Sequence, residues 1–114
     1  MLPEPLFLKQ HDLQPYYKVE VRDSDDQIID LTSANIVCTM ASADGTIKID
    51  RQSTGIQITD AAAGEFEYRW QAGDTDTTGL FYIEFEITPP VGGKFTVPTR
   101  EKAEVRIMKS LDGQ

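Results

Sequence analysis

The sequence contains a single cysteine and a single histidine among its 114 residues. One cysteine cannot form a disulfide within the chain, and one histidine cannot supply a site built from several imidazoles. Cys38 lies in the alternating apolar stretch 36–40 with no other cysteine or histidine nearby in the sequence, which predicts a buried, inert thiol. The lack of disulfides in a small β domain favours folding in a reducing cytoplasm.

Long apolar runs and a basic leader are also missing. No stretch approaches the ~20 apolar residues needed to cross a bilayer, and residues 1–5 lack the basic and apolar regions of a signal peptide. The balance of 19 acidic against 11 basic residues gives a net charge of −8. Such a surface repels phosphate and anionic lipid, so we expect a soluble protein that binds neither nucleic acid nor membranes.

Helical periodicity is weak, and the dominant hydrophobic period is two. Alternation of this kind predicts β-strands with one buried face. Turn residues recur every 8–12 positions, including the Asp-Gly pair at 44–45, and the chain is about one domain long. The sequence therefore predicts an all-β fold, an immunoglobulin-like antiparallel β-sandwich of seven to nine strands with an extended N-terminal arm. The side chains expected to face its core include Tyr17, Val19, Val21, Ile36, Cys38, Met40, Phe66, Tyr68, Trp70, Phe81, Ile83, Phe85, Ile87, Ala103, Val105 and Ile107.

The two ends of the chain differ from its middle. Residues 1–15 hold three prolines around the apolar Leu6, Phe7 and Leu8, which indicates an N-terminal arm or edge strand. This segment either reaches a partner protein or folds back as the first strand of its own domain. We expect the sandwich to span residues 16–109 and residues 110–114 to form a frayed tail.

No arrangement of residues typical of catalysis is found. A glycine-rich phosphate loop, a nucleophile elbow and paired metal-binding cysteines are all missing, and His11 lies in the arm or a loop. We therefore predict a protein that is not an enzyme and has no cofactor or resident metal. The acidic groups 23–26 and 74–76 leave calcium open, but neither matches a twelve-residue calcium loop, and Asp and Thr are common in turns.

Exposed aromatic side chains are few. Tyr82 and Tyr16 are the candidates, because Phe66, Tyr68 and Trp70 share a face opposite charged residues and are expected in the core. An exposed aromatic could serve a carbohydrate-binding module, which is one alternative function. The candidate partner-binding residues are Leu6, Phe7, Leu8, Tyr16 and Tyr82.

Several segments, taken in order, resemble the N-terminal domain of the phage baseplate upper protein family. The resemblance covers residues 7–108, and its elements are moderately specific together and weak separately. They are Lys9-Gln10-His11-Asp12, Ile29-Asp30-Leu31-Thr32-Ser33-Ala34, Gly64-Glu65-Phe66-Glu67-Tyr68-Arg69-Trp70, Gly73-Asp74-Thr75-Asp76, Gly79–Thr88, Lys94-Phe95-Thr96-Val97-Pro98 and Ala103-Glu104-Val105-Arg106-Ile107.

This resemblance implies an immunoglobulin-like module of a tailed-phage virion, assembled in the host cytoplasm. In that family the domain anchors larger receptor-binding or fibre parts, whereas this chain ends just after the domain. We therefore expect a small adaptor of the tail or baseplate that binds other virion proteins and is present in multiple copies in a symmetric assembly. A neck or capsid decoration protein is the alternative within the same class.

Overall fold

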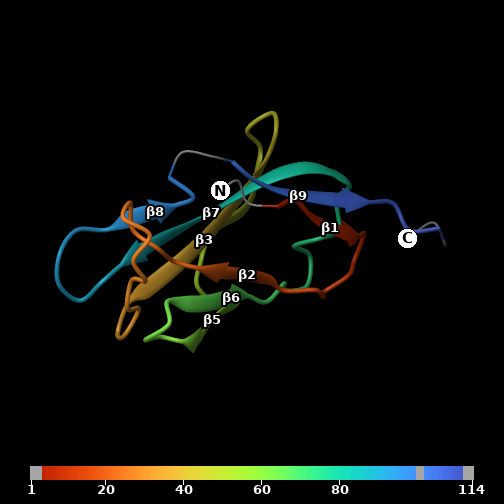
Figure 1. The fold of residues 1–114 in the computed structure, drawn as a ribbon. Helices are drawn as coiled ribbons and strands as arrows, with labels where there is room; N and C mark the ends of the chain where they lie inside the picture. Colours follow the sequence, from red (N-terminus) through yellow and green to blue (C-terminus); the bar gives the residue numbers. More distant parts are fainter. Residues whose placement is uncertain (1–3, 100–101, 112–114) are drawn as a thin grey trace.

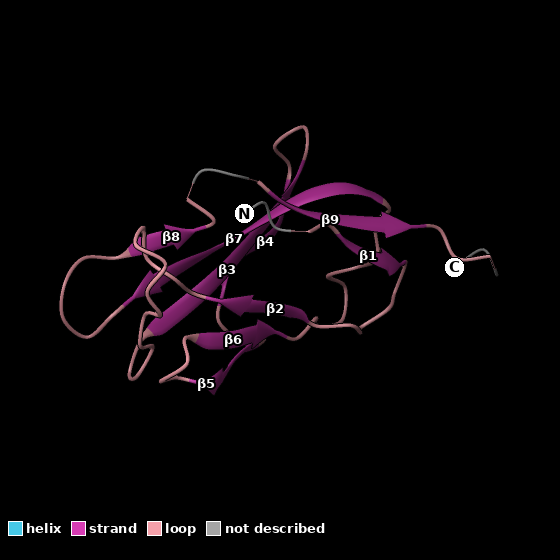
Figure 2. Ribbon diagram, in the orientation of Figure 1, coloured by secondary structure: helices cyan, strands magenta, loops and turns pink. Residues whose placement is uncertain are grey.

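The computed structural model describes residues 4–99 and 102–111, and within these ranges the chain forms strands and loops without an α-helix (Figures 1 and 2). No helix that could cross a membrane occurs in these ranges. The all-β class predicted from the period of two is confirmed. The strands are β1 (Leu6–Lys9), β2 (Tyr17–Glu20), β3 (Asn35–Ser42), β4 (Ile47–Gln52), β5 (Ile56–Asp60), β6 (Glu65–Tyr68), β7 (Gly79–Thr88), β8 (Phe95–Val97) and β9 (Ala103–Met108).

The strands form two sheets that lie one over the other (Figure 1). The larger sheet has the order β1-β9-β7-β3-β4, with β8 also paired to β7, and the smaller sheet has the order β2-β6-β5. β8 pairs with residues 85–87 of β7 and β9 pairs with residues 79–83. β8 and β9 therefore pair with successive parts of the same edge of β7. β7 is the longest of the described strands, with ten residues.

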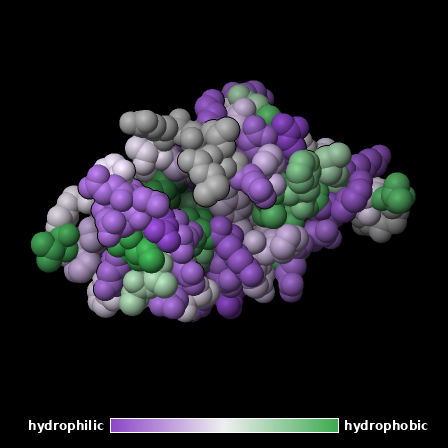
Figure 3. Space-filling view, viewed as in Figure 1, coloured by the Kyte–Doolittle hydropathy of each residue, from purple (hydrophilic) through white to green (hydrophobic). Residues whose placement is uncertain are grey.

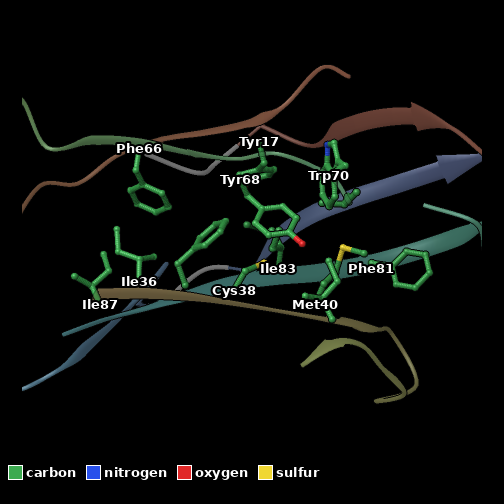
Figure 4. Packing of buried hydrophobic residues seen from close by; sticks show 14 of the residues in the cluster. Tyr17, Ile36, Cys38, Met40, Phe66, Tyr68, Trp70, Phe81, Ile83 and Ile87 are labelled. Atoms are coloured by element: carbon green, nitrogen blue, oxygen red, sulfur yellow. The ribbon is translucent and has the colours of Figure 1, made fainter. Parts of the chain in front are cut away.

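Side chains from both sheets fill the space between the layers, as Figure 4 shows. The ring of Phe85 on β7 lies 5.7 Å from that of Tyr17 on β2 and 5.0 Å from that of Phe66 on β6. Of the side chains predicted to face the core, Val19 is half-buried and the others are buried. The alternation in the sequence therefore identified the inner faces of both sheets.

β1 is one of the two edge strands of the larger sheet, and β4 is the other. β1 runs parallel to β9, with Leu6 opposite Val105 and Leu8 opposite Ile107, and the N–H of Gln10 donates to the carbonyl of Met108. Leu8 is only 3% exposed, whereas Phe7 on the other face is 60% exposed. Residues 6–9 therefore fold back as a strand of their own domain and do not extend away from it toward a partner.

The tail expected at 110–114 lies mostly outside the described residues. Ser110 is half-buried and Leu111 is exposed, and both follow the end of β9. Residues 1–3 of the N-terminal segment also lie outside the description.

Replacing Leu8 by alanine tests whether β1 belongs to the core. We expect Leu8→Ala to lower the free energy of unfolding by about 2–5 kcal/mol, since it leaves a cavity between the sheets. Phe7→Ala, one residue away on the outer face, is the matched control and is expected to change it by less than about 1 kcal/mol. Urea unfolding measures both, and equal, small effects would show that β1 is only loosely attached.

Candidate interaction surfaces

In the acidic segment 23–26, Asp23 forms hydrogen bonds within its own turn. Asp23 Oδ1 accepts the N–H groups of Asp25 and Gln27, each at 2.9 Å, and Arg22 donates to the carbonyl oxygen of Asp26. Across residues 4–99 and 102–111, no three His, Cys, Asp or Glu side chains gather closely enough to hold a metal ion. The bonds of Asp23 match the turn chemistry expected of the sequence 23–27.

The loop 71–78 uses both of its aspartates to bind neighbouring elements. Asp74 Oδ2 accepts the hydroxyl of Tyr68 at 2.7 Å and the N–H of Gln71 at 2.8 Å. Asp76 forms an ion pair with Lys48 of β4, and the hydrogen bond from Lys48 lowers the pKa of the Asp76 carboxyl. The loop is therefore bound by a hydrogen bond to a buried tyrosine of the smaller sheet and by an ion pair to an edge strand of the larger one.

The same loop fixes the linker between β1 and β2. The hydroxyl of buried Thr75 donates to the carbonyl of Asp12 at 2.8 Å, while the Thr75 carbonyl accepts the N–H of His11 at 2.9 Å. The indole N–H of Trp70 donates to the carbonyl of Pro15 at 2.9 Å. His11 is exposed, and it takes part in this connection through its backbone N–H.

The Cys38 thiol and the Tyr68 hydroxyl are buried and stay protonated. Burial raises the pKa of the Cys38 thiol, and the same effect, together with the hydrogen bond to Asp74, raises the pKa of the Tyr68 hydroxyl. A thiol held in this form is a poor nucleophile. The expectation of a buried Cys38 is confirmed by its position in the core.

The outer faces of the two sheets differ in character. The face of the smaller sheet carries mainly charged and polar side chains, namely Lys18, Glu20, Gln57, Thr59, Glu65 and Glu67. The larger sheet carries a shallow groove of about 280 Å³ lined by Thr39, Ala41, Ile47, Tyr82, Ile83, Glu84, Pro98 and Lys102. On the side of the molecule in Figure 3, hydrophobic areas are separate and lie among hydrophilic ones. The groove is lined by apolar side chains together with Thr39, Glu84 and Lys102.

The candidate partner-binding residues lie in different places. Tyr82 lines the groove, and Phe7 lies on the same outer face of the larger sheet, two strands away. Tyr16 lies next to the smaller sheet, half-buried, with the guanidinium of Arg69 5.3 Å from its ring centre. Leu8 is in the core and Leu6 packs against it, so in this fold neither offers a free side chain to a partner.

Ile47 is an exposed residue that the sequence pattern did not single out. It is 54% exposed and pairs with Ala41, which in turn pairs with Tyr82, so the three form one row across the groove. The pairing of β3 with β4 shifts register between Met40 and Ala41, and this shift turns Ile47 outward while Ile49 stays buried. Simple alternation cannot locate such a shift in advance.

No protein-family model matches the chain, and no curated protein matches it in sequence.

The hydrogen bond from Tyr68 to Asp74 is open to a direct test. Tyr68→Phe leaves the ring in the core but removes one donor from a part-buried carboxylate, so we expect a loss of about 1–3 kcal/mol in the free energy of unfolding. Tyr16→Phe is the matched control, with an expected change within about 0.5 kcal/mol. If chemical denaturation finds the two variants equally stable, the loop is not fastened through Tyr68.

Proposed function

We propose that this chain is a non-catalytic structural or adaptor protein of a tailed-phage virion, associated with the tail or baseplate. Its work is to bind other virion proteins in a symmetric assembly. The order of sequence elements that resembles the baseplate upper protein family supports this assignment. The structural observation that carries it is the order of the strands, which fits the immunoglobulin-like fold that the resemblance implies.

The strand order supports an immunoglobulin-like topology of the variable type. In the letters of that fold, β2, β6 and β5 correspond to strands B, E and D, and β9, β7, β3 and β4 to G, F, C and C′. β1 then corresponds to a first strand that joins the larger sheet parallel to the last strand. β8 adds a short pairing beside strand F.

Ring packing takes the place of the disulfide that joins strands B and F in antibody domains. Tyr17 and Phe85 lie on the corresponding strands, β2 and β7, and their rings are in contact. Cys38 lies on β3, the strand that carries the buried tryptophan in antibody domains. This arrangement supports an immunoglobulin-like module that folds without oxidation.

The outer face of the larger sheet is the best-supported contact surface for virion proteins. Tyr82, Ile47 and Ala41 form its apolar row, and Phe7 lies on the same face. An interface core of aromatic and aliphatic side chains with a charged rim is typical of protein–protein contacts. The net charge of −8 favours a partner whose approaching surface is basic.

A carbohydrate-binding module is the weaker alternative. Its support is Tyr82, an aromatic side chain in a groove with polar neighbours. The ammonium group of Lys102 lies 4.7 Å from the centre of the Tyr82 ring, so one face of the ring is already covered. A sugar that stacks on Tyr82 would therefore have to use the other face of the ring.

Gold labelling of purified phage particles with an antibody against this protein tests the proposal. We expect gold at the tail tip, and the protein in the virion proteome. Gold on the neck or capsid would contradict the baseplate assignment and indicate a neck or capsid protein instead. Absence of the protein from pure virions would contradict a structural role altogether.

Incorporation of variants then tests the contact surface. Tyr82→Ala and Ile47→Asp are expected to lower the amount of protein in the virion several-fold, because both lie in the apolar row. Thr59→Asp on the outer face of the smaller sheet is the matched control. Each variant is first checked for an unchanged melting temperature, so that a folding defect is not mistaken for a lost contact.

A further inference from the structure

The outer edge of β2 has no partner strand within the described residues. β2 pairs with β6 alone, in continuous register from Tyr17 opposite Tyr68 to Glu20 opposite Glu65. The N–H of Val21 donates to the carbonyl of Gly64, and the N–H of Arg69 donates to the carbonyl of Gly55. These two bonds show to which side the backbone N–H and C=O groups of alternate residues point. Tyr17 and Val19 therefore direct their backbone groups to β6, while Lys18 and Glu20 direct theirs to the open edge.

The other edges are less suited to pairing. β8, which pairs with β7 alone, has only three residues and is followed directly by Pro98. In β4, Lys48 is the extra residue at the register shift between Met40 and Ala41, and its side chain is bound to Asp76. The pairing of β5 shifts between Ile58 and Asp60. β1 is preceded by Pro5, which has no N–H to donate. Irregularities and prolines of this kind block the addition of a strand, and β2 has neither.

We propose that two copies of this chain associate through their β2 edges, which pair antiparallel about a two-fold axis centred on Val19. In this register Lys18 of each copy lies directly opposite Glu20 of the other, so each pair joins opposite charges. These are also the two residues whose N–H and C=O groups point outward, so they form the hydrogen-bonded pairs of the new ladder. The two three-stranded sheets then become one continuous six-stranded sheet.

The side chains fit this pairing on both faces. Lys18 and Glu20 are exposed on the outer face. Lys18 forms no ion pair among the described residues, whereas Glu20 forms one with Arg22 of its own chain, at the end of the strand. Half-buried Val19 lies on the inner face and meets its own copy at the non-hydrogen-bonded position, where the two strands approach most closely. An isologous contact of this kind needs one self-complementary patch, and β2 supplies it.

Sedimentation equilibrium of the purified chain from about 1 μM to about 1 mM tests this association. We expect a monomer–dimer equilibrium that Lys18→Glu and Glu20→Lys each weaken roughly tenfold, because each change sets like charges opposite one another twice. The double variant carrying both changes restores opposite pairs and is expected to dimerise as the natural chain does. Lys109→Glu, beyond the end of β9, makes the same charge change elsewhere and is expected to affect dimerisation far less.

Glu20→Lys separates pairing from a general charge effect. It makes a strongly acidic chain less acidic by two charges, so simple repulsion between copies predicts tighter association, whereas strand pairing predicts weaker association. Amide exchange gives a second readout: the N–H groups of Lys18 and Glu20 are expected to become protected as concentration rises, while those of Tyr17 and Val19 are protected throughout. A chain that stays monomeric to about 1 mM, or a dimer that the double variant fails to restore, overturns the proposal.

Discussion

The contact of the Phe85 ring with those of Tyr17 and Phe66 is the interaction on which the rest of the structure depends. The three residues come from β7, β2 and β6, so one cluster joins the middle of the larger sheet to two strands of the smaller one. Packed aromatic pairs contribute roughly 0.5–1.5 kcal/mol each beyond the area they bury. With one cysteine in the chain, side-chain packing of this kind has to hold the layers together.

The unequal size of the sheets follows from where the first strand lies. Leu8 anchors β1 beside β9, and the loop 71–78 holds the linker that leads from β1 to β2. A first strand placed there completes the larger sheet and leaves β2 as an edge of the smaller one. The larger sheet offers a face with an apolar groove, and the smaller sheet offers an open edge. These are the two surfaces through which we propose contact with other proteins.

Sequence patterns predicted the inner faces well, because alternation reports directly on burial: Phe81, Ile83, Phe85 and Ile87 all face the core as expected. They left open whether residues 6–8 fold back, because pairing between β1 and β9 joins segments about a hundred residues apart. The outward turn of Ile47 depends on a register shift that has no signature in the sequence. The hydrogen bonds of Thr75 and Asp74 were also beyond prediction, since polar loop residues choose partners only once the strands are in place.

The claim that the first strand joins the larger sheet, and so leaves β2 open, is tested most directly by backbone nuclear Overhauser effects. We expect the pattern of a parallel pair between β1 and β9, with Leu6 close to Val105 and Leu8 close to Ile107. Contacts from residues 6–9 to Tyr17–Glu20 instead would place the first strand on the smaller sheet and contradict the account.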